Sequence, residues 1–580
     1  MAQILTWRDR FTAFLDRRAA RKAGRARIVA SFATPPEPVS VGLVAKGRQL
    51  VAGEFLFSGL RITNPLLSIW DIVTDNSDVI ADLHGCEWLD DLAALGDESA
   101  RARAQMWVFD WIRRYGAGTG PGWTPDITAR RLRVWIGHSD FLLRGQSKAA
   151  TDQFMQSLGR QALFMARRWH ATAPGLPRIA AVATAITASV VLNNGSSASV
   201  DRAVAALVVA GQGHIDDQGT VRTRNPQELL AVLTHLVTAA QALHATRRSV
   251  PAEVSGLITR IVPVLRGLRH VDGGLARFHG GGRGAEGRLD AALAAAGVKT
   301  PATQPTAMGF ARLTAGRTSV IVDAAAPPVG PASRDAHAST LALEVTSGRR
   351  PLFVNCGSGA RFGEDWRRAS RATPSHSTLG LEGVSSSHLG QTDDELLSDV
   401  PRLVRAELVT DSTGRRLDLS HNGYQPSHGL THARILHLSG DGRSLTGEDL
   451  LTTLDATDEA RFDHVFDQTL RAGVRFAIRF HLHPDVTCAT TQDKEAVTLW
   501  LKSGEIWIFR HDGAAQLSVS PSVYLENGQL KPRPTQQVVL SGSALAYATR
   551  VRWSLAKADN TPLAVRDLAR ADPLDVADQT

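Results

Sequence analysis

The hydrophobic period changes once along this chain of 580 residues, and no other feature of the sequence constrains the fold as strongly. Between residues 80 and 297 the apolar positions recur at helical spacing, as Phe154, Leu158 and Met165 do. After Thr318 apolar and polar residues alternate, which is typical of strands with one buried face. The sequence therefore predicts a helical domain followed by a domain of antiparallel strands.

The boundary between the two patterns lies in residues 297–306, which hold two prolines and few large apolar side chains. Such a composition is typical of an interdomain linker. We expect an α/α-toroid-like helical domain followed by an antiparallel β-sandwich, because turn residues separate successive helices and successive strands. The expected parts are a basic N-terminal segment (1–45), the helical domain (46–297), the linker (298–308), the sandwich (309–560) and a tail (561–580).

The chain is basic, with 65 Lys and Arg against 57 Asp and Glu and a formal net charge of +8. A positive field attracts anionic partners, although arginine-rich composition also arises from GC-rich coding. Residues 1–29 are rich in Arg but hold no continuous apolar run, so we expect no secretory signal there. This segment fits two interpretations: a solvated amphipathic helix, or a surface that binds acidic lipid or nucleic acid.

Other features exclude several classes of protein. The three cysteines lie far apart, so the sequence predicts neither a disulfide framework nor a thiolate zinc cluster. The apolar stretch at 179–192 is too short and too polar to span a membrane. The Gly280–Gly282 run lacks the Lys-Ser/Thr of a phosphate loop, so we expect no nucleotide cofactor. No Gly-x-Ser-x-Gly elbow indicates a serine hydrolase.

The segment 222–228, Arg-Thr-Arg-Asn-Pro-Gln-Glu, predicts the start of a helix. Asn225 is suited to cap it, Pro226 to the first helical position and Glu228 to the third. A helix start also presents backbone N–H groups and a positive dipole end to an anion. Arg222 and Arg224 would reinforce that attraction.

Two histidines lie beside small hydroxyl residues at the head of predicted strands. His337 precedes the alternating run that ends near the turn at Ser347–Gly348, and His376 lies in the segment 371–379. Asn355 follows the strand that returns from the turn. These three side chains are therefore aimed at one sheet.

Together these stretches resemble the heparinase II/III-like family of polysaccharide lyases, and the helices-then-strands order is also that of the family. The resemblance implies β-elimination on an anionic, uronate-containing polysaccharide, either heparin- or heparan-like or from a bacterial envelope. In such chemistry a donor neutralises the uronate carboxylate before a base removes the C5 proton. The resemblance assigns the neutralising role to Asn225 and Glu228, and substrate contacts to Arg222, Arg224 and Tyr424.

The position of the family's catalytic tyrosine holds Phe278, and a phenyl ring cannot transfer a proton. His279 and His376 are the candidate substitutes, because a histidine titrates near neutral pH. A histidine that merely binds the backbone of its loop is the alternative for His279. Tyr424, in a cluster with His421, His428 and His432, is a further candidate to replace the lost acid.

The resemblance also implies a metal site formed by His337, Asn355 and His376. In the family an aspartate occupies the position of Asn355, so this chain has exchanged an anionic ligand for a neutral amide. Zinc would bind such a set more weakly. Two interpretations stay open, a weakened zinc site and a pair of structural histidines.

Three functions follow from the sequence. The first is a polysaccharide lyase. The second is a non-catalytic carbohydrate-binding or envelope-polysaccharide assembly protein that keeps the fold. The third, an inverting glycoside hydrolase, needs a second carboxylate facing Glu228, and the sequence offers no obvious one. The expected partner is an anionic polysaccharide rather than nucleic acid. The family implies the cell envelope, whereas the lack of a signal fits the cytoplasm; the oligomeric state is left open.

Overall fold

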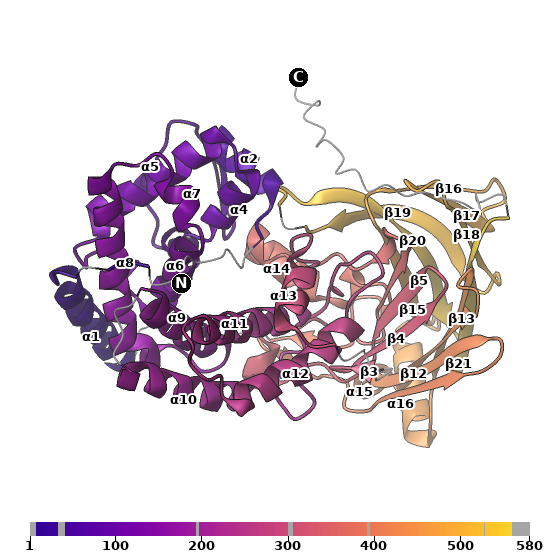
Figure 1. Ribbon diagram of the computed structural model, residues 1–580. Helices are drawn as coiled ribbons and strands as arrows, with labels where there is room; N and C mark the ends of the chain where they lie inside the picture. Colours follow the sequence, from indigo (N-terminus) through magenta and orange to yellow (C-terminus); the bar gives the residue numbers. More distant parts are fainter. Residues whose placement is uncertain are drawn as a thin grey trace. The chain divides into compact units, whose positions relative to one another are not determined.

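The computed structural model describes residues 7–28, 30–32, 41–192, 197–299, 306–390, 395–526 and 528–559 (Figure 1). The expected tail, 561–580, lies outside the described residues. So do residues 300–305 of the expected linker and residues 1–6, 29 and 33–40 of the basic N-terminal segment.

The chain forms two compact units that interleave in sequence. The first comprises Met1–Gly219, Glu228–Val262 and Ala285–Thr300, and the second comprises Thr220–Gln227, Pro263–Gly284 and Pro301–Thr580. The sequence pattern places 220–227 and 263–284 among the helices, but both segments pack with the strands. Both carry candidate site residues, which therefore belong to the second unit.

The first unit is helical, as the 3.6-residue period predicts. Figure 1 shows its helices following one another in an arc, with α1 on the outer side of α8. The helices are α1 (Trp7–Gly24), α2 (Val44–Ala52), α3 (Ser77–Gly85), α4 (Trp88–Leu95), α5 (Glu98–Tyr115), α6 (Pro125–Gly137), α7 (Ser139–Leu143), α8 (Lys148–Arg168), α9 (Leu176–Val191), α10 (Ser197–His214), α11 (Pro226–Ala245), α12 (Ala252–Gly267) and α13 (Arg288–Ala296). A short hairpin, β1 (Glu54–Phe57) and β2 (Leu60–Thr63), joins α2 to this array.

Aromatic side chains fill much of the helical core. Trp88 meets Trp107 edge-on at a centroid distance of 5.1 Å, and Trp111 meets Trp135 in the same way at 5.3 Å. Such pairs add about 0.5–1.5 kcal/mol to the burial of their surface. Trp135 belongs to the core, because its side chain is fully buried. Among the described helices, α11 is long and apolar enough to cross a membrane, but half of its most apolar window is buried, as in a core helix.

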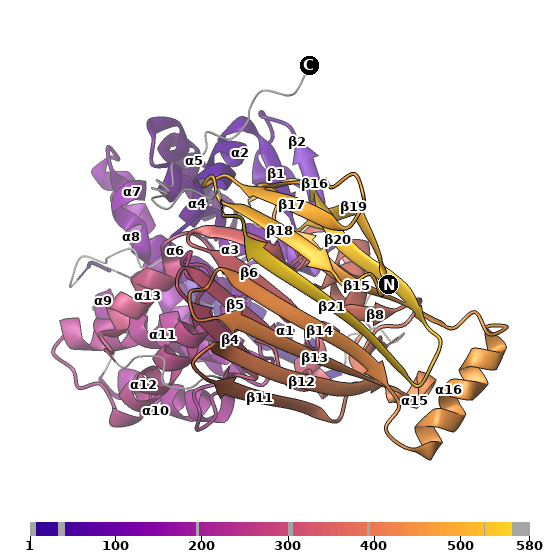
Figure 2. The same ribbon diagram turned by 90° about the vertical axis from the view of Figure 1, so that its right-hand side faces the viewer.

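The second unit contains two large sheets in which every recorded pairing is antiparallel (Figure 2). One sheet has the order β11-β12-β13-β14-β21-β18-β17-β16, and the other has the order β19-β20-β15-β7-β6-β5-β4-β3, with β8 paired to β15. The strands are β3 (Thr306–Ala307), β4 (Phe310–Ala315), β5 (Thr318–Asp323), β6 (Leu343–Ser347), β7 (Arg350–Val354), β8 (Leu379–Leu381), β9 (His388–Leu389), β10 (Leu397–Ser398), β11 (Val404–Thr410), β12 (Gly414–Tyr424), β13 (Leu430–Ser439), β14 (Ser444–Thr452), β15 (Val474–Leu482), β16 (Val486–Thr490), β17 (Ala496–Leu501), β18 (Ile506–His511), β19 (Gln516–Tyr524), β20 (Arg533–Ala544) and β21 (Ala548–Lys557). The additional helices are α14 (Glu364–Arg371), α15 (Gln425–His428) and α16 (Ala456–Gln468).

One hydrophobic core takes side chains from both large sheets. Phe480, on β15, lies 4.7 Å from the ring of Trp553 on β21 and 5.0 Å from the ring of Phe509 on β18. The predicted turn at Ser347–Gly348 is confirmed, since it joins β6 to β7 and Gly348 has a φ of 57°. The coarse prediction, a helical region followed by antiparallel sheets, is therefore confirmed.

Candidate functional site

The predicted start of α11 is confirmed. The helix begins at Pro226, and Asn225 Oδ1 accepts a hydrogen bond from the backbone N–H of Gln227 at 2.9 Å. This bond satisfies one of the backbone donors that a helix start leaves without an intrahelical partner. Asn225 therefore has a structural role whatever else it does, and its side chain is half-buried.

The glycine-rich loop after Phe278 packs against this helix start. Gln227 Oε1 accepts a hydrogen bond from the backbone N–H of Gly282 at 2.9 Å. A Cβ at position 281 would lie 2.7 Å from Asn225 Oδ1, so glycine allows the close approach there. His279 has a left-handed backbone, with a φ of 47°. The loop is thus fixed to the segment that the sequence predicts as a substrate-neutralising site.

Phe278 is fully buried, and its ring centroid lies 5.0 Å from that of Phe310. A hydroxyl group at this position would therefore face packed side chains rather than open solvent. Tyr424, the suggested replacement for the acid, is also fully buried, and its hydroxyl donates to the Leu379 carbonyl at 3.0 Å. Burial raises the pKa of the Tyr424 phenol above its usual range. This burial corrects the expectation that Tyr424 contacts substrate.

The two arginines beside Asn225 have opposite environments. Arg222 is exposed, whereas Arg224 is buried with a φ of 53°. The Arg224 guanidinium donates to Asp323 Oδ1 at 2.5 Å and to the backbone carbonyls of Met308, Gly309, Ala325 and Ala326. These bonds use the five N–H donors of the guanidinium. The expectation that Arg224 contacts substrate is therefore corrected. Of the two arginines, only Arg222 is exposed to a ligand.

Asp323 joins the buried arginine to the candidate base His279. Its Oδ2 accepts from the Ser339 hydroxyl at 2.7 Å and lies 3.3 Å from His279 Nε2. The His279 contact does not have hydrogen-bond geometry, so its effect is electrostatic. Burial alone would raise the pKa of Asp323, but Arg224 and His279 more than offset it and hold the pKa well below its usual range. The carboxylate is therefore ionised at neutral pH.

His279 is fully enclosed. Its Nδ1 accepts the backbone N–H of His337 at 3.2 Å, which directs the Nε2–H toward Asp323. Burial lowers the pKa of His279, and the nearby Asp323 only partly reverses this effect. The side chain is 0% exposed. His279 therefore binds a backbone group, as the alternative from the sequence has it, but that group belongs to His337 and not to its own loop.

His337 and His376 are brought together, as predicted, but they bind each other. His376 Nδ1 donates to the Ala372 carbonyl at 2.9 Å, which leaves Nε2 as the acceptor. His337 Nδ1 lies 3.0 Å from that nitrogen and must donate to it. Burial lowers the pKa of His376 to about 4 and that of His337 well below its usual value, so both rings are neutral.

Asn355 does not complete a metal site with these histidines. Its Oδ1 accepts the backbone N–H of Ser377 at 3.0 Å, and its Nδ2 donates to Glu344 Oε1 at 3.3 Å. The two imidazoles satisfy each other, and the amide supplies no negative charge, so the donor set does not fit Zn²⁺. In the described ranges no group of three or more His, Cys, Asp or Glu side chains is arranged to hold a metal ion.

Glu228, the second candidate on α11, pairs with a histidine of the helical unit. Its Oε1 lies 2.9 Å from His214 Nε2, and both side chains are 16% exposed. This carboxylate oxygen is therefore already paired with a side chain of the protein. Glu228 and His214 both belong to the first unit, whereas Asn225 belongs to the second.

The sequence analysis identified only the histidines of a second buried cluster. His421 and His432 are cross-strand partners, with His432 Nδ1 3.3 Å from His421 Nε2. His432 also meets Asp449 Oδ1 at 2.8 Å, and the same oxygen accepts from Arg434 Nε at 2.8 Å. Buried and less buried residues alternate along β13 and β14, and Arg434 and Asp449 stand at buried positions of this pattern. A charged residue at a predicted buried position is the sequence signal that would have identified them.

Comparison with known proteins identifies relatives of this chain. The "FtsZ-localized protein C" of Caulobacter vibrioides is 30% identical over 538 residues, which cover 90% of this chain and 89% of that protein. The family described as "Heparinase II/III-like, C-terminal" matches residues 298–554. The chain belongs to the heparinase II/III-like family.

Two solved structures place this heparinase II/III-like chain in the same fold. A heparinase III structure aligns with a TM-score of 0.61 and 13% identity, over 93% of this chain and 89% of that one. A mutant of the heparan sulfate lyase HepC from Pedobacter heparinus aligns with a TM-score of 0.55 and 14% identity, over 95% and 89%. At this level of identity the likeness establishes the fold, while function depends on the site.

Proposed function

We propose that this chain is a non-catalytic member of the heparinase II/III-like family, which binds an anionic envelope polysaccharide without cleaving it. One observation carries the proposal: each candidate for moving the C5 proton is enclosed and already bonded. His279 holds a backbone N–H and faces Asp323, and the accepting nitrogen of His376 is occupied by His337. A general base must lie within hydrogen-bond reach of the proton it removes.

The finer architecture is part of the same proposal. We propose that the helices form an α/α-toroid and that the two large sheets form a β-sandwich. The aromatic contacts of Phe480 with Trp553 and Phe509 support face-to-face packing, because these residues come from different sheets. The likeness to the heparinase III structure, which extends over 93% of this chain, supports the toroid.

The main test is a lyase assay with matched substrates. We expect the wild-type protein to form no unsaturated uronate from heparan sulfate or from a uronate-containing bacterial polysaccharide, measured as new ultraviolet absorbance with an active lyase as positive control. Phe278→Tyr should also be inactive, because position 278 is fully buried. Activity in the wild type that His279→Ala and His376→Ala both abolish would instead establish the lyase function.

Binding should depend on Arg222, the exposed arginine beside the start of α11. We expect Arg222→Gln to weaken binding of the acidic polysaccharide several-fold, since an exposed charge pair contributes about 0.2–1 kcal/mol. Arg405→Gln removes the same charge from an exposed position on β11, the end strand of the sheet that runs from β11 to β16, and serves as the control. Affinity electrophoresis in gels that contain the polysaccharide measures both. Equal weakening by the two variants would show that Arg222 acts only through the net charge of the protein and does not contact the polysaccharide.

The histidine pair should be structural rather than metal-binding. Protein purified without chelator should contain well below one zinc per chain by elemental analysis, because His337 and His376 occupy each other's nitrogens. Chelator treatment should leave thermal stability unchanged. Near-stoichiometric zinc that His376→Ala loses would contradict this assignment and restore the predicted site of His337, Asn355 and His376.

A role beside the bacterial division machinery is a second candidate, favoured by the relative in Caulobacter vibrioides. That protein is named for its localisation with FtsZ, and the two chains align over nearly their whole lengths. We propose that this chain acts as a polysaccharide-binding partner of the division apparatus. Co-sedimentation with polymerised FtsZ tests the proposal, and absence of this chain from the pellet at micromolar concentrations would contradict it.

A further inference from the structure

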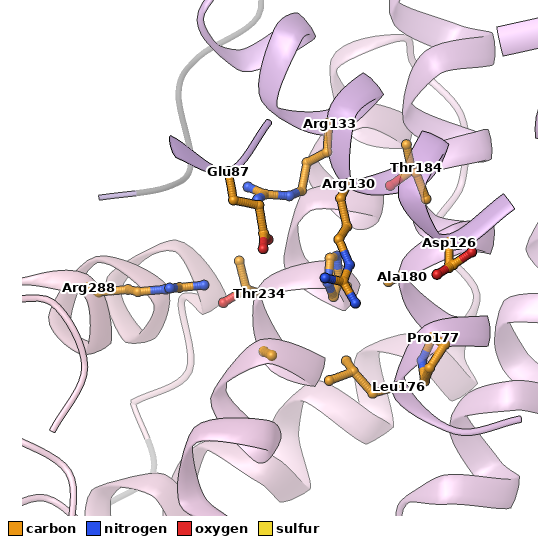
Figure 3. Close-up of a pocket in the computed structure, with 13 residues that line it drawn as sticks. Glu87, Asp126, Arg130, Arg133, Leu176, Pro177, Ala180, Thr184, Thr234 and Arg288 are labelled. Carbon is orange, nitrogen blue, oxygen red and sulfur yellow. The ribbon is translucent and has the colours of Figure 1, made fainter. Parts of the chain in front are cut away.

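The helical unit contains a cavity that the proposed polysaccharide function does not use. It has a volume of about 310 Å³ and is lined by residues of α6, α9, α11 and α13 (Figure 3). That volume lies at the lower end of the range of small-molecule sites, about 300–1,000 Å³. The whole lining belongs to the first unit, so the cavity is defined within it alone.

Arginines from two helices face this cavity. Arg130 and Arg133 lie three residues apart on α6, and Arg288 approaches from α13; Figure 3 shows the Arg130 and Arg288 guanidinium groups directed to the same space. Arg133 is partly neutralised, since its Nη2 lies 3.3 Å from Glu87 Oε1 and 3.6 Å from Asp90 Oδ2. Within the described ranges, no hydrogen bond or ion pair is recorded for the side chain of Arg130 or of Arg288.

Arg130 and Arg288 share this space with two carboxylates of the lining, those of Glu87 and Asp126. Burial lowers the pKa of Arg288, and the neighbouring Arg133 lowers it further. The lining holds three arginines against two carboxylates, so the cavity keeps a positive charge that favours an anionic ligand. Guanidinium groups bind carboxylate and phosphate oxygens through two parallel hydrogen bonds.

One side of the lining fits the neutral body of a small ligand. Leu176, Pro177 and Ala180 provide an apolar wall on α9, and the buried Thr184 points a hydroxyl group into the cavity. His235, on α11, has its pKa lowered to about 3, first by burial and then by the three arginines. It is neutral and can donate or accept a hydrogen bond without competing for the anion.

We propose that this cavity is a binding site for a small oxyanion ligand of about monosaccharide size, which Arg130 and Arg288 hold by its phosphate or carboxylate group. The site is separate from Arg222 and Asn225, and it does not depend on whether the chain binds polysaccharide. The apolar wall of α9 and the hydroxyl group of Thr184 would contact the body of the ligand.

Isothermal titration calorimetry of the full chain tests the site with four probes: inorganic phosphate, glucose 6-phosphate, glucuronate and glucose. We expect at least one anionic sugar to bind with a Kd below about 1 mM and glucose not to bind. Comparison of glucose 6-phosphate with glucuronate shows whether the site prefers a phosphate or a carboxylate group. No binding of any anion up to about 10 mM would overturn the proposal.

Variants separate this site from general charge. Arg130→Gln and Arg288→Gln should each weaken binding of the anionic sugar tenfold or more. Arg167→Gln removes an exposed arginine on α8 and should leave binding unchanged. Ligand should raise the thermal midpoint of the wild type and not that of the Arg130→Gln, Arg288→Gln double variant. Binding that survives in the folded double variant would overturn the assignment.

Discussion

Replacing Asp323 by Ala should lower the free energy of unfolding by about 3–5 kcal/mol, the range expected when one partner of a buried ion pair is removed. Asp323 is fully buried and accepts from Arg224 at 2.5 Å and from Ser339 at 2.7 Å. Without the carboxylate, the Arg224 guanidinium would stay buried with no anionic partner, held by backbone carbonyls and the ring of Phe310. Urea unfolding of the full chain measures the loss.

The chain offers a control for this experiment. Asp335, in the segment before His337, has a side chain that is 64% exposed and reaches Arg367 only at 3.5 Å. Asp335→Ala should therefore change stability by less than about 1 kcal/mol. Adding Arg224→Leu to Asp323→Ala should recover part of the loss, because the uncompensated charge is then gone. Equal losses from Asp323→Ala and Asp335→Ala would show that no buried pair stabilises this region.

Local patterns predicted the elements well because they depend on neighbouring residues. The change of hydrophobic period gave the helical and β regions, and the Asn225-Pro226 pair gave the start of α11 to the residue. Each of these signals follows from backbone geometry within a few positions. The three cysteines are free, as their spacing predicts.

Burial at the site could not be predicted in the same way. Arg222 and Arg224 are two residues apart and identical in type, yet one is exposed and the other binds loop carbonyls about a hundred residues away. Asp323 ends β5 and carries no motif, so no local pattern connects it with His279. Both facts depend on which segments the fold brings together, and a local pattern does not record that.

The same limit explains the corrected roles of the histidines. A histidine beside glycines or small hydroxyl residues suggests catalysis, because such neighbours leave room for substrate. In the folded chain that room is filled by other parts of the protein: Phe310 packs near His279, and His337 covers His376. The family fold has been kept while the groups that would carry the chemistry are enclosed, which supports a binding function over a lyase.

Acid should destabilise both units well above the pH at which carboxylates titrate. His84, in the helical unit, has its pKa lowered to about 3 by burial and by Arg131, and His481, in the other unit, has its pKa lowered to about 3 by burial and by His376. Between pH 6.5 and these values the unfolded chain takes up protons that the folded chain does not. Each histidine therefore lowers the free energy of unfolding by about 1.4 kcal/mol per pH unit as the pH falls through that window.

The contribution of His84 can be isolated through the slope of stability against pH. Its Nδ1 accepts the Trp111 indole N–H at 3.1 Å, so protonation of that nitrogen would break the bond and place a second cation near Arg131. His84→Gln removes the titration and should flatten the slope between pH 6.5 and 5 by about 1.4 kcal/mol per unit, even if it lowers stability at pH 7.5. His388→Gln, at a side chain that is 50% exposed, is the matched control for the loss of a histidine. Urea unfolding at pH 7.5, 6.5, 5.5 and 5 measures the three proteins, and identical slopes for the wild type and His84→Gln would show that His84 is already protonated in the folded chain.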